Sequence, residues 1–266
     1  RMTENRRRTM EKIQQIADQL ISQHRNKKQF SNLLGNLRPV SKEEAYLAQF
    51  EFQARSSRGP LGGFKIALAS STQQELCGIN SPIAGGIFLK EIFPNNHQIF
   101  LDQYHGLGLE FELAFRISKQ ISPNDLRTKE FNMLSCVADI YPAFELIADR
   151  DADYQNLDAL TLIADNAWSA GVVLGDPIPN WENISLTDLT SSLYWNSEPI
   201  MLAPIINANP LTSLAWVTNH LGNMGKIIPK DSIIITGSVL QTRKPIKGDK
   251  VIYKMENFAQ VEVSII

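Results

Sequence analysis

The sequence predicts an α+β protein, with a helical N-terminal region over residues 1–55 and a β-rich domain over residues 56–266. Three observations support this class. Apolar residues recur at helical spacing near the start of the chain, short strand-like segments dominate after residue 63, and the later helices interrupt the strands instead of alternating with them. This order favours a β-rich roll over a doubly wound parallel sheet.

The N-terminal region contains two predicted helices. Apolar residues follow three- and four-residue steps through residues 3–24, which places on one helix face Met10, Ile13, Ile16, Ala17, Leu20 and Ile21. The second helix starts at Ser41, because Glu44 three residues later forms a capping-box pattern, and it continues through Phe50. We expect the two helices to pack on each other or on a partner subunit.

The β-rich domain follows a glycine-rich loop, residues 56–63, that leads into a strand over residues 64–69. Further strands are predicted over residues 98–101, 107–117, 144–148, 171–174, 232–235, 250–255 and 260–266. One helix interrupts them at residues 157–168, and another begins at Pro210 and ends at Gly222. Because the glycine-rich loop precedes a strand and not a helix, it does not fit a phosphate-binding loop.

Composition limits the classes of function. The 266 residues carry 26 lysines and arginines against 28 aspartates and glutamates, so no global positive field attracts nucleic acid, and none is expected as a partner. Cys77 and Cys136 are too few for a disulfide framework. No window reaches the roughly 18 apolar residues of a membrane span, and no signal-peptide pattern occurs. We expect a cytoplasmic protein without a membrane partner.

Carboxylates within apolar strands are the strongest chemical signal. Alternation along residues 107–117 places Glu110 and Glu112 on one face, roughly 7 Å apart by strand geometry. A cation between them would relieve their repulsion, and hard oxygen ligands suit Mg²⁺, Mn²⁺ or Ca²⁺ better than zinc. The alternative is a solvated face of an edge strand. Glu145, in another apolar strand, could be a third ligand or could pair with Arg150.

Two further features could belong to the same site. Lys65 lies in an apolar strand, so its ammonium must reach water or meet an anion. If it faces the carboxylates, it could attract a substrate anion or transfer a proton. The turn from Thr236 to Ser238 follows three isoleucines and could hold a carboxylate, with a plain turn as the alternative. The four histidines have no metal or triad spacing.

Six segments carry a resemblance to a known family. In order along residues 40–266 they read GGFKIALASS, LEFELAFRI, PAFELIADR, IADNAWSAGVVLG, NPLTSLAWVTNHL and IIITGSVLQTRKPIKGD. The sequence resembles the 2-keto-4-pentenoate hydratase and 2-oxo-3-hexenedioate decarboxylase family of the fumarylacetoacetate hydrolase superfamily. The resemblance implies a mixed β-roll of the fumarylacetoacetate hydrolase C-terminal-domain type for the catalytic domain.

The same resemblance implies the site. Glu110, Glu112 and Glu145 match the three carboxylates that bind Mg²⁺ or Mn²⁺ in the family, and Lys65 matches its active-site lysine. The family's substrate is a small 2-oxo or 2-hydroxydienoic acid. The ion then stabilises enolate-like charge at the 2-oxygen while protons move along the conjugated chain.

Substrate contacts complete the main hypothesis, and the reaction and the partners follow from the resemblance. Ser169, Thr236 and Ser238 are expected to contact the substrate carboxylate. A hydratase of this kind ketonises the dienol and adds water to give a 4-hydroxy-2-oxo acid, whereas a decarboxylase releases CO₂ from a 2-oxo diacid. A homo-oligomer is expected, and a complex of hydratase and decarboxylase subunits is compatible with the family.

Departures from the family pattern keep the reaction open. Ile83 and Ala84 stand where hydratases carry an acidic residue and an aromatic one, and the loss of a proton acceptor there weakens the hydration hypothesis. Trp168 stands where the family usually has a small residue. Hydration is the first expectation, decarboxylation of 2-oxo-3-hexenedioate the second, and a non-catalytic accessory subunit the third.

Overall fold

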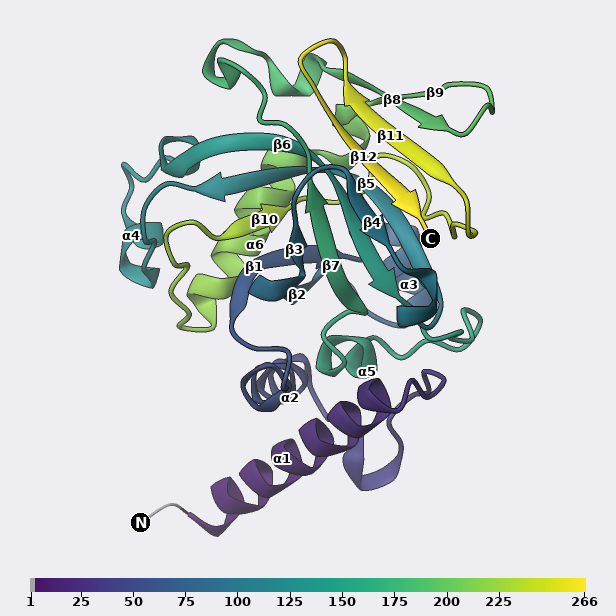
Figure 1. The fold of residues 1–266 in the computed structure, drawn as a ribbon. Coiled ribbons are helices and arrows are strands. Elements are labelled where there is room, and N and C mark those ends of the chain that lie inside the picture. Colours follow the sequence, from purple (N-terminus) through teal and green to yellow (C-terminus); the bar gives the residue numbers. More distant parts are fainter. Residues whose placement is uncertain (1–2) are drawn as a thin grey trace.

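Two β-sheets pack on each other in the computed structural model, which describes residues 3–266 (Figure 1). Within that range the larger sheet has seven strands in the order β2-β1-β10-β5-β6-β7-β3, and the smaller has five in the order β4-β12-β11-β8-β9. The larger sheet comprises β1 (Leu61–Ala67), β2 (Ile83–Phe88), β3 (Ile92–Phe93), β5 (Leu107–Ile117), β6 (Val137–Ala148), β7 (Ser169–Leu174) and β10 (Ile233–Ile235). The smaller sheet comprises β4 (His97–Ile99), β8 (Thr190–Trp195), β9 (Met201–Pro204), β11 (Lys250–Met255) and β12 (Ala259–Ile265). Both sheets are mixed, since β1 pairs in parallel with β10 and β4 with β12.

One face of the larger sheet supplies most of the hydrophobic core. Alternation along β5 buries Leu109, Phe111 and Leu113 in the cluster that joins the two sheets. There the ring centroid of Phe111 lies 5.8 Å from that of Tyr253 on β11. The intervening side chains of β5 point to the opposite face. The larger sheet therefore has a dry face and a second face on which polar side chains meet.

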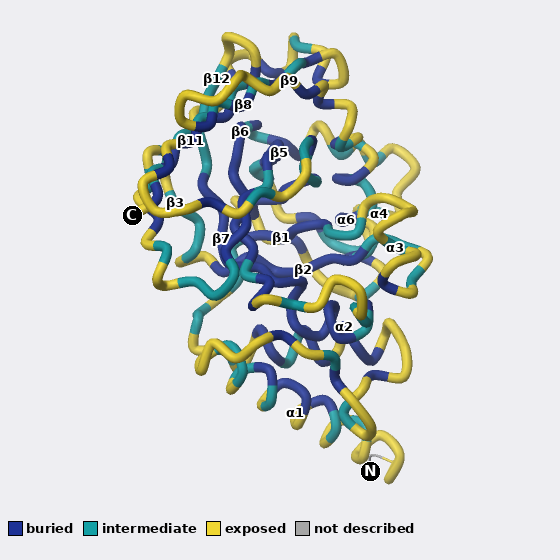
Figure 2. Tube along the Cα trace, turned by 90° about the vertical axis from the view of Figure 1, so that its right-hand side faces the viewer, coloured by how far each residue is buried: buried dark blue, intermediate teal, exposed yellow. Residues whose placement is uncertain are grey.

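The N-terminal helices cover one end of the larger sheet, below it in Figure 1. The apolar stripe of α1 (Glu4–Arg25) is buried mainly against α2 (Lys42–Arg55) through Ile13, Ile16, Ala17 and Leu20. Figure 2 shows α1 buried along one side and exposed along the other. This stripe is thus covered within the chain. The division of the chain at residue 55 stays a prediction.

The start of α2 matches the sequence in part. Ser41 caps the helix, because its side chain accepts a hydrogen bond from the Glu44 backbone N–H at 3.1 Å. The Glu44 carboxylate accepts from the Val40 N–H at 2.7 Å, one residue before the donor that a reciprocal capping box uses.

Four further α-helices lie within residues 3–266: α3 (Ser71–Cys77), α4 (Pro123–Arg127), α5 (Ala159–Ala164) and α6 (Pro210–Asn223). The predicted α+β class and the mixed sheets are confirmed. The predicted strands 107–117 and 250–255 coincide with β5 and β11. Across the described chain, no helix has both the length and the apolar character that a membrane crossing requires.

The predicted helix over residues 157–168 is wrong in its second half. α5 ends at Ala164, and Asn166, Ala167 and Trp168 adopt left-handed backbone conformations with φ of 70°, 51° and 57°. Three successive non-glycine residues rarely adopt this conformation, because the Cβ approaches the following carbonyl oxygen. Contacts from other parts of the chain override the local helical pattern at this point.

Candidate metal centre and active-site cavity

Three carboxylates meet on the polar face of the larger sheet. The antiparallel register of β5 and β6 places Glu110 directly opposite Glu145 and Glu112 opposite Ala143. One oxygen atom from each of the three glutamates lies within 4.8 Å of the others. Glu112 and Glu145 are buried and Glu110 is partly exposed. The strand register alone therefore assembles a set of three converging oxygen ligands.

Lys65 of β1 joins this cluster. Its Nζ forms an ion pair with Glu145 and donates a hydrogen bond to the carbonyl oxygen of Ala167 at 2.8 Å. The lysine side chain is only 2% exposed. One ammonium beside three carboxylates leaves two negative charges without a compensating cation when all four groups are ionised. A divalent ion would balance them.

The electrostatics of the four groups reflect this excess of negative charge. Burial raises the pKa of Glu110 to about 8 and that of Glu112 to about 7, and the negative charge of Glu145 adds to the shift at Glu110. Burial likewise raises the pKa of Glu145 to about 8, although Lys65 opposes the shift. Burial by itself lowers the pKa of Lys65, but the carboxylates, Glu145 foremost, outweigh it and raise that pKa. Without a cation, the cluster therefore retains protons near neutral pH.

Hydrogen bonds orient the carboxylates but leave oxygen atoms free. Thr242 Oγ1 donates to Glu110 Oε1 at 2.6 Å, and the Gly237 backbone N–H donates to Glu112 Oε2 at 3.0 Å. Within residues 3–266, no donor hydrogen-bonds to Glu112 Oε1 or to Glu145 Oε2, although both are buried. Unpaired buried acceptors are costly. A hard cation that takes oxygen ligands fits these atoms.

A cavity of about 570 Å³ opens from the cluster. Lys65 and Glu110 line it, and within the described part of the chain they are its only charged lining residues. Its remaining walls are apolar or carry uncharged polar groups, and they include the indole rings of Trp168 and Trp216. The cavity is large enough for a small organic acid whose polar end meets the charged groups.

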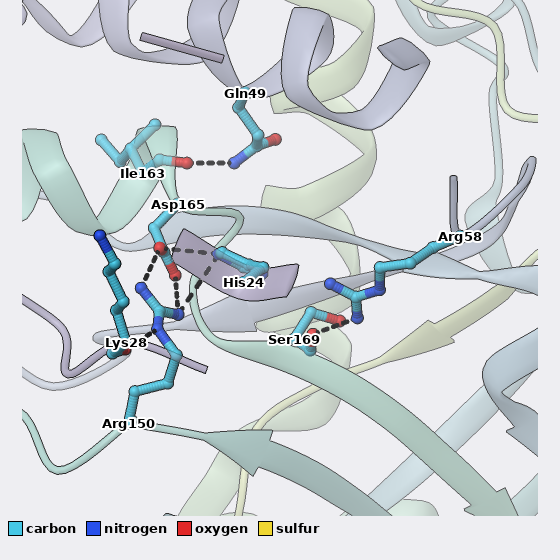
Figure 3. Close-up of polar contacts among 8 residues, drawn as sticks. All are labelled: His24, Lys28, Gln49, Arg58, Arg150, Ile163, Asp165 and Ser169. Atoms are coloured by element: carbon cyan, nitrogen blue, oxygen red, sulfur yellow. Dashed lines mark hydrogen bonds and ion pairs between the residues drawn. The ribbon is translucent and has the colours of Figure 1, made fainter. Parts of the chain in front are cut away.

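The residues predicted to bind the substrate carboxylate do not lie together. Ser238 lines the cavity, with its hydroxyl donating to the Leu240 carbonyl at 2.7 Å. Thr236 is fully buried and donates to a backbone carbonyl of β5. Ser169 lines a second cavity, of about 320 Å³, where its carbonyl accepts a hydrogen bond from Arg58 (Figure 3). The structure therefore brings Ser238, but not Ser169, to the carboxylate cavity.

Sequence reasoning missed several residues around the cavity. Thr242 holds Glu110, and Trp216 of α6 forms part of the wall. Tyr154 also lines the cavity, where its hydroxyl donates to Asp149 at 2.6 Å. None belongs to a motif with recognisable spacing. Their only sequence signal is the position of Thr242 and Trp216 inside family-like segments.

Ile83 and Ala84, which the resemblance sets against an acidic and an aromatic residue, lie outside the cavity. Ile83 and Ala84 are 0% and 3% exposed, and both belong to a buried apolar cluster with Tyr46 and Trp168. Pro82 is the neighbouring residue that reaches the cavity wall. The side chains of Ile83 and Ala84 therefore do not form the wall of the cavity.

Comparisons with known proteins agree with this geometry. The chain is 28% identical to 2-oxo-hept-4-ene-1,7-dioate hydratase of Escherichia coli over 88% of this chain and 90% of the relative. It is 25% identical to 2-keto-4-pentenoate hydratase of Paraburkholderia xenovorans over 87% and 86% of the two chains. The structure of 4-oxalocrotonate decarboxylase from Pseudomonas putida G7, complexed with magnesium and adipate, superposes with a TM-score of 0.84, at 20% identity over 97% and 98% of the chains. That likeness shows the shared fold and confirms the predicted β-roll. No protein-family model matches the chain.

Proposed function

We propose that this chain, which belongs to the 2-keto-4-pentenoate hydratase and 2-oxo-3-hexenedioate decarboxylase family of the fumarylacetoacetate hydrolase superfamily, is a divalent-metal-dependent hydratase. Its substrate is a short 2-hydroxydienoate such as 2-hydroxypenta-2,4-dienoate, and its product is a 4-hydroxy-2-oxo acid. The observation that carries the proposal is the buried cluster of three carboxylates and one lysine at the base of a cavity.

We assign the metal to Glu110, Glu112 and Glu145. Bound there, Mg²⁺ or Mn²⁺ would supply positive charge that stabilises negative charge developing on the 2-oxygen of the substrate. Thr242 and the Gly237 N–H hold two of the carboxylates in place for this role. The magnesium in the related decarboxylase structure supports the choice of metal.

We assign anion attraction and proton transfer to Lys65. Among the described residues that line the cavity, Lys65 is the one with a positive charge. Its Nζ therefore attracts an anionic substrate. Contact with Glu145 keeps the ammonium protonated, so Nζ can donate a proton to a carbon of the dienolate, which becomes the ketone while the lysine becomes a neutral amine. Ser238 remains our candidate for a substrate contact at the same end of the cavity.

The lining of the cavity favours a monoacid. Leu157, Leu162 and the two tryptophans contribute apolar surface to its walls. A second carboxylate would lose water without gaining a cation from the described lining residues, which costs binding free energy. The cavity therefore supports hydration of a dienoate with an uncharged tail over decarboxylation of a diacid.

One observation favours decarboxylation as the second candidate. With Ile83 and Ala84 in place of the acidic and the aromatic residue of hydratases, Glu110 is the sole carboxylate that lines the cavity in the described chain. Addition of water requires a group to accept a proton, whereas loss of CO₂ needs only the electron sink at the 2-oxygen. An accessory subunit that binds metal without turnover is the third candidate.

An ultraviolet assay separates these candidates. Purified protein is incubated with Mn²⁺ and either 2-hydroxypenta-2,4-dienoate or 2-oxo-3-hexenedioate, while absorbance and CO₂ release are followed. The hydratase consumes the dienoate chromophore without CO₂ and yields the 4-hydroxy-2-oxo acid. CO₂ from the diacid would establish the decarboxylase instead. Silence with both substrates, in protein that binds Mn²⁺, would refute both and favour the accessory subunit.

Location and assembly belong to the same proposal. The thiols of Cys77 and Cys136 are both free and buried, which supports a reducing cytoplasm.

Exposed apolar side chains on and beside β9, at Ile200, Met201 and Leu202, support a homo-oligomer.

A further inference from the structure

The left-handed segment after α5 touches the active-site lysine. Asn166, Ala167 and Trp168 all have positive φ, and the Ala167 carbonyl accepts the hydrogen bond from Lys65 Nζ at 2.8 Å. Trp168 lines the carboxylate cavity beside it. A backbone in this sparsely populated conformation persists only where its surroundings hold it. The contacts that hold it therefore fix the position of the Ala167 carbonyl.

Contacts at both ends anchor the segment, as Figure 3 shows. Before it, Gln49 of α2 donates to the Ile163 carbonyl at 2.9 Å, and Asp165 accepts hydrogen bonds from Arg150. After it, Arg58 donates to the Ser169 carbonyl at 2.7 Å. These anchors fix the ends but leave the three left-handed residues to be held separately.

The side chain of Asn166 holds the middle of the segment. Its Oδ1 accepts from the Gly86 N–H at 2.7 Å, and its Nδ2 donates to the Gly86 carbonyl at 3.0 Å. Gln53 of α2 donates to the same Oδ1 at 2.9 Å. Asn166 is 0% exposed and Gln53 is 8% exposed, so water does not compete for these bonds.

Close packing leaves this arrangement little freedom. A Cβ atom placed on Gly85, which lies opposite Lys65 in the pairing of β1 and β2, would stand 3.0 Å from the Asn166 carbonyl oxygen and 3.2 Å from Lys65 Cγ. The backbone at Asn166 and the stem of Lys65 therefore share one tight space. The hydrogen bond from Lys65 Nζ to the Ala167 carbonyl links the lysine directly to the segment.

We propose that Asn166 is a positioning residue for the reaction, because its amide clamp on Gly86 and Gln53 presents the Ala167 carbonyl to Lys65. The ammonium has three N–H donors, and the carbonyl takes one, so the contact with Glu145 and the approach to the substrate use the others. The clamp gives α2 of the N-terminal region a part in catalysis through Gln53. This inference rests on the proposed function of Lys65.

Asn166→Gly tests the clamp without adding strain, because glycine tolerates a positive φ. Asn196→Gly is a control for the loss of an amide side chain at positive φ: Asn196 has a φ of 52°, and its exposed side chain makes two hydrogen bonds, to Asp249 and Lys250. It directly follows β8 in the smaller sheet. Gln53→Met is a milder variant that removes one hydrogen-bond donor to Asn166. If Asn166→Gly does not fold, this variant still tests whether the clamp positions Lys65.

The measurement combines steady-state kinetics on 2-hydroxypenta-2,4-dienoate at saturating Mn²⁺ with the rate of reductive methylation of Lys65, followed by mass spectrometry. For Asn166→Gly we expect kcat to fall about 100-fold while KM changes less than about 3-fold, because positioning fails but binding survives. Methylation of Lys65 should accelerate. Gln53→Met should show the same changes in weaker form, and Asn196→Gly should match the wild type.

Wild-type kcat in Asn166→Gly with unchanged Lys65 methylation would overturn the inference. So would equal losses of kcat in Asn166→Gly and Asn196→Gly, since the effect would then be one of general stability. An inactive wild-type protein would count against the proposed function instead, and the methylation rates would still decide whether the clamp holds Lys65.

Discussion

Glu145 of β6 lies directly opposite Glu110 of β5, and both carboxylates share the face that Lys65 reaches from β1. Two like charges at opposed positions of adjacent strands destabilise a sheet. Burial increases that cost, because the protein interior screens charge less than water does. In our proposal a divalent cation offsets this cost, so structure and chemistry would depend on the same four side chains.

Removal of one ligand should abolish turnover without unfolding the protein. Glu112→Gln keeps the size of the side chain and the contact with the Gly237 N–H. It removes one of the negative charges that would bind the metal ion. We expect metal-dependent turnover to fall at least about 100-fold. Circular dichroism should remain that of the wild type. Glu130→Gln, at an exposed glutamate, is the control, and full activity in Glu112→Gln would contradict the metal assignment.

Stability of the metal-free protein should decrease as pH rises. Burial raises the pKa values of Glu110, Glu112 and Glu145 from 4.5 to about 8, 7 and 8. At pH values between these limits, the folded state therefore binds more protons than the unfolded state. The free energy of unfolding therefore falls between about pH 4.5 and pH 8. Thermal melts with EDTA and with Mg²⁺ test this: Mg²⁺ should raise Tm more at pH 8 than at pH 5. A larger effect at pH 5 would be the contrary result.

The buried ion pair beside the left-handed segment should be needed for folding. Asp165 is 0% exposed and accepts hydrogen bonds from Arg150, the shorter at 2.8 Å. Asp165→Asn leaves the guanidinium without its counter-charge, which costs about 3–5 kcal/mol. Urea denaturation measures the loss, with the exposed Asp188→Asn as control. A loss below about 1 kcal/mol, the range of exposed pairs, would contradict this account.

The same pair predicts a limit at acid pH. Burial alone would raise the pKa of Asp165, but His24 and Arg150 outweigh it and lower that pKa from 3.8 to about 2. The stabilisation is therefore fully present above about pH 4 and is lost as the pH falls through 2. Wild type and Asp165→Asn should converge in stability at the acid end of a urea titration series. A constant difference down to pH 2 would argue against it.

Substrate choice should respond to a new charge at the mouth of the cavity. Leu76 of α3 lines the cavity and is 68% exposed, so Leu76→Arg adds a cation at the rim without disturbing the core. We expect kcat/KM for 2-oxo-3-hexenedioate relative to 2-hydroxypenta-2,4-dienoate to rise about 10-fold. Leu134→Arg, at an exposed leucine that does not line the cavity, should leave the ratio unchanged. An unchanged ratio in Leu76→Arg would mean that the tail of the substrate does not lie there.

Local sequence patterns predicted the strand that carries the carboxylates but not the way they meet. Alternation sufficed for the bounds of β5 and for placing Glu110 and Glu112 on one face. The contact with Glu145 depends on the register of β5 with β6, and Lys65 reaches the cluster although β10 lies between β1 and β5. Such relationships arise from pairing between distant strands, which no short window contains. The roles of the site residues stay predictions.

The left-handed segment is a place where a local sequence pattern predicts the wrong conformation. Residues 157–168 have a helical pattern, yet hydrogen bonds from Gln49, Gln53 and Gly86 hold the chain in another conformation after Ala164. Tertiary contacts override local helix propensity here. The hydrogen bonds pair the buried side-chain amides of Gln49, Gln53 and Asn166, which would be costly to leave without partners. Thr242 escaped prediction for a similar reason, since its partner Glu110 is distant in the chain.

Titration of metal-free protein with Mn²⁺, while the absorbance of 2-hydroxypenta-2,4-dienoate is followed, tests the central claim most directly. Turnover should be absent without metal, should saturate at one Mn²⁺ per chain, and should disappear again with EDTA. Glu112→Gln should show no such saturation. Turnover that persists in EDTA, or that saturates unchanged in Glu112→Gln, would contradict the assignment of the buried carboxylates as the metal centre.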